Sequence, residues 1–102
     1  MKVAFIILHY LTQKDTQSCL DSMLTVLQDP EVEVVVVDNC SQNGSYEYLE
    51  ERYDHFQQIH FIHLSENQGF ARGNNAGYQY AKTVLGSEWI IMINNDTLMI
   101  QP

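Results

Sequence analysis

Positively charged residues are scarce in this chain. Five Lys and Arg stand against thirteen Asp and Glu, which gives a formal net charge of -8, and the five do not cluster. Because a phosphate backbone is recognised mainly through clustered Lys and Arg, we expect no nucleic-acid partner. A small anionic ligand would need local help from a metal ion or from a helix N-terminus.

Cysteines and long apolar runs are also few. Cys19 and Cys40 have neither CxxC spacing nor a Cys/His cluster beside them, which argues against structural zinc and favours two free thiols in a reducing cytosol. The apolar run after Lys2 is shorter than the core of a signal peptide, and no run reaches the length of a membrane span. We therefore expect a cytoplasmic protein.

Glycine-rich phosphate loops are missing as well. The segment after the first apolar run, HYLTQKD, contains neither GxGxxG nor GxxxxGK[ST], so dinucleotide dehydrogenases and P-loop NTPases are excluded. It has no glycine, which disfavours a nucleotidyltransferase, and His9 and Tyr10 supply no acidic pair, which disfavours a phospho-accepting receiver domain. With 102 residues and 45% hydrophobic content, the chain is one globular domain or part of one.

Four apolar segments are typical of β-strands: Lys2–Leu8, Glu33–Val37, Ile59–His63 and Trp89–Ile93. The second contains four consecutive valines, and the last shows no polar alternation; both patterns predict strands that are covered on both faces. The third is interrupted by His60 and His63, which favours a sheet edge.

Three segments between these strands have helical features. Leu20, Met23, Leu24 and Leu27 lie at helical spacing and predict a helix from Asp15 to Gln28. Ser45 is the expected N-cap of a short second helix that carries Leu49 and Tyr53. The third helix is expected from Ala71 to Leu85, ended by Gly86.

Glycines recur every four residues at Gly69, Gly73 and Gly77. Arg72, Asn74 and Asn75 lie between them, which excludes a membrane dimerisation face. We expect these glycines to permit close approach of the backbone to the sheet or to a ligand.

The order β-α-β-α-β-α-β predicts an α/β fold with a mainly parallel sheet and right-handed crossovers. Polar residues follow three of the strands: His9 and Tyr10, then Asp38 and Asn39, then Asn94, Asn95 and Asp96. The carboxyl ends of parallel strands share one edge of the sheet, where α/β proteins bind ligands.

The polar residues after the second strand suit a pyrimidine base. Asp38 only accepts hydrogen bonds, whereas the amide of Asn39 also donates, and together they complement uracil or thymine. Tyr10 is a candidate to stack on the base. The alternative is that Asp38 and Asn39 only turn the chain.

Asp96 is a hard oxygen ligand, and Mg²⁺ or Mn²⁺ is commonly held by one or two carboxylates with substrate phosphates. Its alternative role is to cap a turn with Thr97. Arg72, near a helix N-terminus, is a candidate contact for a diphosphate, with a solvated arginine as the alternative. His9 is a candidate to face a ligand.

Three motifs in order, VVVVDNCSQNGS, ENQGFARGNNAGYQYA and WIIMINNDT, resemble the nucleotide-binding half of family 2 glycosyltransferases, including rhamnosyltransferase-like members. The opening VAFIILHYL fits the family's first strand, so the resemblance covers essentially the whole chain. It implies a Rossmann-like GT-A fold with strand order 3-2-1-4, a UDP- or dTDP-sugar donor, a divalent metal and inversion at the anomeric carbon.

The resemblance also implies roles for individual residues. Asp38 would hold the pyrimidine ring with Tyr10 and Asn39 near it, and Asp96 would bind the metal. The DXD position reads Asn94-Asn95-Asp96, so its first acid is replaced by an amide. The remaining implied donor contacts are Arg72, Asn74 and Asn75.

In this family the acceptor-binding half and the catalytic base follow the DXD strand. We therefore expect residues 1–102 to be the donor-binding part, truncated before the acceptor-binding part, with its base beyond Pro102, and inactive alone. The parent enzyme would transfer sugar to a saccharide or lipid-linked acceptor in polysaccharide or glycoconjugate synthesis, in the cytoplasm or peripherally at the inner membrane face. The alternative is a non-catalytic module that self-associates through Trp89–Ile93, an apolar edge strand in that order.

Overall fold

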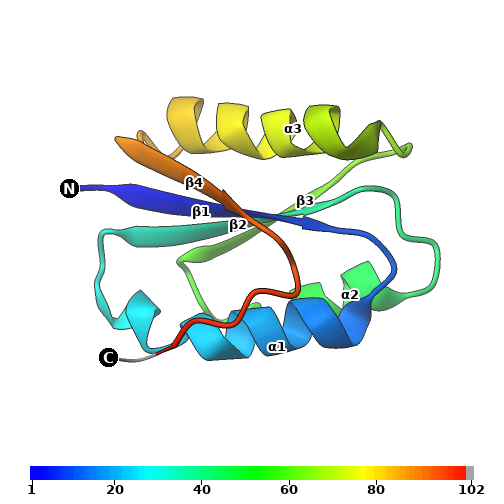
Figure 1. The fold of residues 1–102 in the computed structure, drawn as a ribbon, viewed down its shortest axis with the longest axis horizontal. Helices are drawn as coiled ribbons and strands as arrows, with labels where there is room; N and C mark the ends of the chain where they lie inside the picture. Colours follow the sequence, from blue (N-terminus) through cyan, green and yellow to red (C-terminus); the bar gives the residue numbers. More distant parts are fainter. Residues whose placement is uncertain (101–102) are drawn as a thin grey trace.

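The computed structural model describes residues 1–100 of the chain. Its four strands form one parallel sheet in the order β3-β2-β1-β4, which confirms the predicted fold class and strand order. The strands are β1 Val3–His9, β2 Val32–Asp38, β3 Ile59–His63 and β4 Trp89–Ile93. The helices are α1 Gln13–Met23, α2 Ser45–Arg52 and α3 Gly69–Thr83, with a 3₁₀ helix at Val26–Gln28. Figure 1 shows α1 and α2 on one face of the sheet and α3 on the other.

The two central strands supply the core on both faces of the sheet. Val34 and Val36 of β2 pack with α1 and α2, around Leu20 and Leu49. Val35 and Val37, on the opposite face of the same strand, pack under α3, in a cluster that includes Ile6 and Ala81. All four valines are fully buried, so the prediction that β2 is covered on both faces is confirmed.

Two glycines of α3 allow this helix to lie close to the sheet. A Cβ atom at Gly73 would lie 2.5 Å from Leu8 Cδ1, and one at Gly77 would lie 2.5 Å from Ile6 Cγ2. The predicted close approach is confirmed at these two positions. At Gly69 the space around an added Cβ is open, so there is no close approach to the sheet, and approach to a ligand stays a prediction. The backbone there has a positive φ of 81°, which favours glycine.

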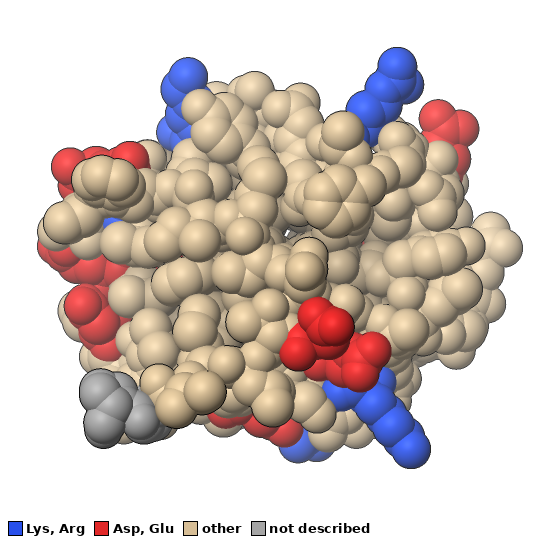
Figure 2. All heavy atoms as spheres, in the orientation of Figure 1, with Lys and Arg blue, Asp and Glu red and all other residues tan. Residues whose placement is uncertain are grey.

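The prediction that Trp89–Ile93 is covered on both faces is wrong. β4 pairs only with β1 and forms one edge of the sheet, and the exposed fractions of Trp89, Ile91 and Met92 are 59%, 41% and 49%. The apolar pattern of β4 therefore marks an uncovered edge strand, as the predicted strand order implies. Figure 2 shows the surface over β4 almost free of charged atoms. The prediction that β3 forms the opposite edge is confirmed.

Several helix boundaries differ from those expected. α1 runs from Gln13 to Met23, and a turn separates it from the 3₁₀ helix, which still buries Leu27. β-branched residues at the break, Thr25 and Val26, weaken the continuous helix predicted to Gln28. α3 begins earlier and ends sooner than expected, and Gly86, with a φ of 66°, lies beyond its end at Thr83.

The N-cap prediction for α2 is also wrong. Gly44 occupies the N-cap position in a left-handed conformation, and Ser45 is the first helical residue. The Ser45 hydroxyl bonds to His9 and Asn43 instead of capping the helix. Tyr53 is buried but follows the last helical residue.

Candidate functional site

The carboxyl ends of β1, β2 and β4 meet at one edge of the sheet, as the parallel register requires: His9 lies beside Asp38 and Ile7 beside Ile93. A cleft of about 270 Å³ opens there between the ends of β1 and β4 and the start of α3. Its lining consists of Leu8, Tyr10, Thr12, Phe70, Asn74, Ile93, Asn94, Asn95 and Asp96. The structure thus gathers Tyr10, Asn74 and the three residues after β4 around one space.

The loop after β1 presents Tyr10 to the cleft from a strained turn. Leu11 has a φ of 63°, which is costly for a residue with a side chain. Two bonds from the neighbouring loop hold it: the Leu11 amide donates to Ser41 Oγ at 2.8 Å, and Asn43 Nδ2 donates to the Leu11 carbonyl at 2.8 Å. Tyr10 remains 44% exposed, so an aromatic face is available at the cleft.

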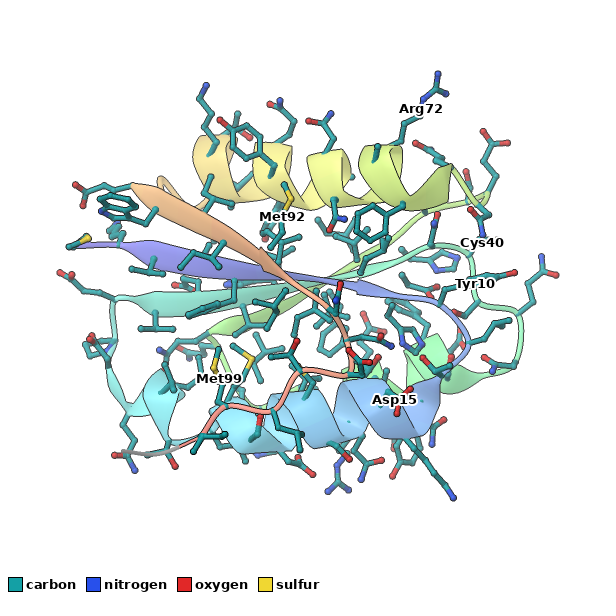
Figure 3. All side chains as sticks on the ribbon, in the orientation of Figure 1. Tyr10, Asp15, Cys40, Arg72, Met92 and Met99 are labelled. Atoms are coloured by element: carbon teal, nitrogen blue, oxygen red, sulfur yellow. The ribbon has the colours of Figure 1, made fainter. Side chains whose placement is uncertain are left out.

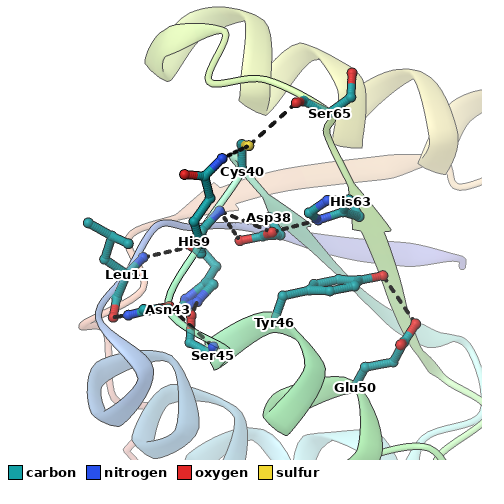
Figure 4. A network of polar contacts seen from close by, with 12 residues as sticks. His9, Leu11, Asp38, Cys40, Asn43, Ser45, Tyr46, Glu50, His63 and Ser65 are labelled. Atoms are coloured by element: carbon teal, nitrogen blue, oxygen red, sulfur yellow. Dashed lines mark hydrogen bonds and ion pairs between the residues drawn. The ribbon is translucent and has the colours of Figure 1, made fainter.

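Asp38 lies beside the cleft but does not line it. Its side chain is fully buried, and its carboxylate accepts bonds from the Ser41 amide at 3.2 Å and from His63 Nδ1 at 2.8 Å (Figure 4). The centroid of the Tyr46 ring lies 4.8 Å from that of the His63 ring, so Tyr46 of α2 packs against the Asp38–His63 pair. The carboxylate therefore already has internal partners.

Asn39 is also bonded within the protein. Its Oδ1 accepts from the Gln68 amide at 2.9 Å, and its Nδ2 donates to the Gly69 carbonyl at 3.3 Å. These bonds fix the first turn of α3, which brings Phe70 and Asn74 to the cleft. Asn39 thus shapes the cleft without lining it.

The residues after β4 form the solvent-exposed part of the site. The Thr97 amide donates to the Asn94 carbonyl at 3.0 Å, which closes a turn. Asn95 Nδ2 donates to Thr12 Oγ1 at 2.7 Å and to Thr16 Oγ1 at 3.1 Å. Because both bonds use Nδ2, the Asn95 carbonyl oxygen remains an acceptor for a ligand.

Asp96 is exposed and supplies the single carboxylate of the cleft lining among residues 1–100. Burial raises the pKa of the Cys19 thiol to about 11, and the nearby charge of Asp96 adds to this rise. No group of three His, Cys, Asp or Glu suited to a metal occurs within residues 1–100. One carboxylate with amide oxygens fits Mg²⁺ or Mn²⁺ only when the phosphates of a ligand complete the coordination.

Arg72 and Asn75 lie outside the cleft lining in the described structure. Both are exposed on α3, and Arg72 extends away from the sheet (Figure 3). Contact of either residue with a ligand stays a prediction.

Sequence reasoning missed Thr12, Phe70 and the role of Thr16. The threonines at i and i+4 at the start of α1 were a usable signal, because this spacing places both hydroxyls on one side of the helix. The expectation that His9 faces a ligand is wrong: His9 is fully buried between Thr16 and Ser45.

A larger hollow of about 570 Å³ lies elsewhere, between α2 and β3. Its lining includes Glu47, Glu50, Glu51 and Asp54. Four carboxylates repel a diphosphate, and none of the predicted site residues lies there, so the smaller cleft is the better candidate.

The parallel sheet thus carries an aromatic residue, amides and one carboxylate at its carboxyl edge, where α/β folds bind their ligands. The profile of the family described as "Glycosyl transferase family 2" matches residues 4–101. The chain belongs to this family, so the resemblance inferred from its motifs is confirmed.

Individual relatives agree with this assignment. The chain is 28% identical over 94 residues to the low-salt glycan biosynthesis hexosyltransferase Agl10 of Haloferax volcanii, covering 92% of the chain and 27% of Agl10. It superposes on residues 1–349 of TarS of S. aureus with a TM-score of 0.79 at 26% identity, covering 96% of this chain and 28% of the TarS 1–349 chain. TarS is also known in complex with UDP and with UDP-GlcNAc.

The fold is shared more widely. The mannosyltransferase PcManGT of Pyrobaculum calidifontis, solved with GDP-Man and Mn²⁺, superposes with a TM-score of 0.83 at 23% identity, covering 98% of the chain and 29% of PcManGT. The chain spans less than a third of the length of each of these relatives. Among residues 1–100, no helix has the length and apolar character needed to cross a membrane.

Proposed function

We propose that this chain binds a nucleotide-diphospho-sugar in the cleft at the carboxyl edge, together with Mn²⁺ or Mg²⁺. It would serve as the donor-binding part of an enzyme that transfers the sugar with inversion to an acceptor hydroxyl, in polysaccharide or glycoconjugate synthesis. The observation that carries the proposal is the convergence of Tyr10, Asn74 and the Asn94-Asn95-Asp96 turn on one space. Family membership and the nucleotide complexes of TarS support it.

Each cleft residue has a chemical role in this proposal. Tyr10 stacks on the base, with UDP or dTDP as the expected nucleotides. Asn94 and Asn95 accept hydrogen bonds from ribose or sugar hydroxyls. Asp96 is the protein ligand of the metal, which when bound would neutralise charge on the leaving diphosphate. Arg72 and Asn75 would contact the donor only after movement of their exposed side chains.

Direct contact of Asp38 and Asn39 with a pyrimidine stays a prediction. Asp38 is buried, and its oxygens already accept bonds from Ser41 and His63. Contact with a base would require the loop after β2 to open. In the described conformation, these two residues support the cleft instead.

The proposed reaction also needs a general base to take the proton of the acceptor hydroxyl. The cleft lining within residues 1–100 has one carboxylate, Asp96, and metal binding occupies it. We therefore propose that the base and the acceptor site belong to residues outside this chain, and that residues 1–102 alone do not transfer sugar.

Calorimetry with the folded chain tests the proposed donor binding. We expect saturable binding of UDP or dTDP that is tighter with Mn²⁺ or Mg²⁺, and loss of this metal dependence in Asp96→Asn. Asp54→Asn is the matched control, because Asp54 is an exposed carboxylate of the other hollow. Absence of binding of UDP, dTDP and GDP with either metal would remove the proposal.

A second candidate is self-association through β4, with a second copy of the chain as partner. The observation in its favour is the exposed apolar edge strand, because unpaired N–H and C=O groups readily pair with another strand. Sedimentation should show dimers at high micromolar concentration, and Ile91→Lys should dissociate them while Val84→Lys should not. A monomeric wild-type chain would contradict this candidate.

A further inference from the structure

Behind the cleft, a buried chain of hydrogen bonds connects the residues after β4 to the start of α2. His9 lies at its centre: its Nδ1 is 2.6 Å from Thr16 Oγ1, and its Nε2 is 2.8 Å from Ser45 Oγ. His9 and Thr16 are fully buried, and Ser45 is 1% exposed. Thr16 also accepts the bond from Asn95 Nδ2 at 3.1 Å. The chain thus ends on a residue of the candidate site.

The partners at the far end determine the direction of the bond between His9 and Ser45. The Ser45 hydroxyl donates to Asn43 Oδ1 at 2.6 Å, so its oxygen must accept from His9, and His9 carries its hydrogen on Nε2. In a neutral ring the other nitrogen, Nδ1, is an acceptor and receives the hydroxyl hydrogen of Thr16. This leaves the Thr16 oxygen free to accept from Asn95, as the structure shows.

This order of donors requires a neutral His9. Burial lowers the pKa of His9 below its ordinary value, and the opposing effect of the Asp38 charge on the adjacent strand is smaller. A protonated ring would place a hydrogen on Nδ1 as well, and the Thr16 hydroxyl could no longer donate to it. Burial of the ring therefore favours the neutral form that this order of donors needs.

We propose that His9 and Thr16 are positioning residues that hold the side-chain amide of Asn95 from behind. Resting on the proposed function, this assigns them the task of presetting the Asn94–Asp96 turn for the diphosphate and its metal. Both Nδ2 hydrogens of Asn95 are bonded, one to Thr12 and one to Thr16. The amide is thereby oriented before a ligand arrives, which reduces the ordering cost of binding.

A double-mutant cycle separates positioning from general structural support. UDP affinity in the presence of Mn²⁺ is measured by calorimetry for wild type, Thr16→Val, Asn95→Ala and the double variant, with dTDP used if it binds more tightly. The loss of one bond is expected to weaken binding about fivefold in Thr16→Val and about tenfold in Asn95→Ala. If Thr16 acts through Asn95, the double variant loses about tenfold, not about fiftyfold.

Two further variants keep the test decisive. Thr16→Ser retains the hydroxyl and should restore wild-type affinity, whereas Thr83→Val removes an exposed hydroxyl on α3 and should change nothing. In the free protein, the two side-chain amide protons of Asn95 should have well-separated chemical shifts. The separation between these two shifts should decrease in Thr16→Val and in His9→Phe. A loss of UDP affinity of about fiftyfold in the double variant would overturn the positioning role. Asn95 side-chain resonances that stay unchanged in Thr16→Val and His9→Phe would also overturn it.

The same measurements distinguish the two proposals. A wild-type chain that binds no nucleotide with Mn²⁺ contradicts the proposed function and, with it, the role of the turn in donor binding. A wild-type chain that binds nucleotide, with Thr16→Val equal to it in affinity, contradicts the positioning role alone.

Discussion

At the end of β2, Asp38 and Asn39 are buried and bonded to the protein itself, whereas at the end of β4, Asn94 and Asp96 are exposed around the cleft. Both pairs follow strands of one parallel sheet and contain an amide and a carboxylate. The difference lies in their neighbours. β2 is a central strand, and the residues at its end bond to His63 of β3 and to Gln68 and Gly69 at the start of α3, whereas β4 is an edge strand. Asp38 and Asn39 at the end of β2 therefore support the site, whereas Asn94 and Asp96 at the end of β4 are exposed to a ligand.

The largest expected effect is on stability at the β2 end. Asp38→Ala removes a buried acceptor and leaves the Ser41 amide and His63 without it, which should lower the free energy of unfolding by about 3 kcal/mol. Asp96→Ala, on an exposed carboxylate, should stay within about 0.5 kcal/mol of wild type. Urea denaturation measures the free energy of unfolding of both variants. Equal losses would contradict the difference between the β2 end and the β4 end.

A smaller effect on stability is expected for Asn39, whose side-chain amide bonds to the start of α3. Asn39→Ala loses two bonds to the first turn of α3 and should cost about 2 kcal/mol. Asn75→Ala is the matched control, because Asn75 is exposed on the same helix. Thermal unfolding of both variants gives the difference. A larger loss for Asn75→Ala would show that burial and internal hydrogen bonds do not decide which amides stabilise the fold.

The buried His9 at the end of β1 should make the stability of the protein depend on pH. The pKa of His9 in the folded state is lowered by burial, so the unfolded chain takes up a proton first as pH falls. This contribution to stability is complete above the ordinary value of about 6.5 and is lost as pH falls from there to the folded-state pKa. Denaturation at several pH values should show this loss, and His9→Gln should reduce it; an identical pH profile would contradict a neutral His9.

The smallest effect is expected at the strained loop. Leu11→Gly relieves the positive φ but increases the freedom of the unfolded chain, so stability should change by less than about 1 kcal/mol. Nucleotide affinity should fall slightly, because Tyr10 is held less firmly. Calorimetry and denaturation on the same samples check this. A large stability loss would mean that the Leu11 side chain, not its backbone, supports the loop.

The sequence predicted the sheet order through the family resemblance. It predicted the place of the cleft through the parallel topology, which brings the carboxyl ends of the strands to one edge of the sheet. It did not predict which polar residues stay open. Asp38 and Asp96 both follow apolar strands, and their difference arises from partners distant in sequence, such as His63 for Asp38. The local pattern of β4 predicted a covered strand, because covered and uncovered apolar strands have similar local patterns. Only the strand order implied by the family resemblance indicated that β4 is an uncovered edge.

The most direct test of the comparison is the position of a bound Mn²⁺ ion. Paramagnetic broadening of backbone amide resonances, recorded with UDP or dTDP present, should be strongest at residues 94–97, weaker at the Asp38–His63 pair, and absent in Asp96→Asn. Broadening centred on the acidic hollow between α2 and β3, or on Asp38 and His63, would contradict the assignment of the β4 end as the ligand-binding side.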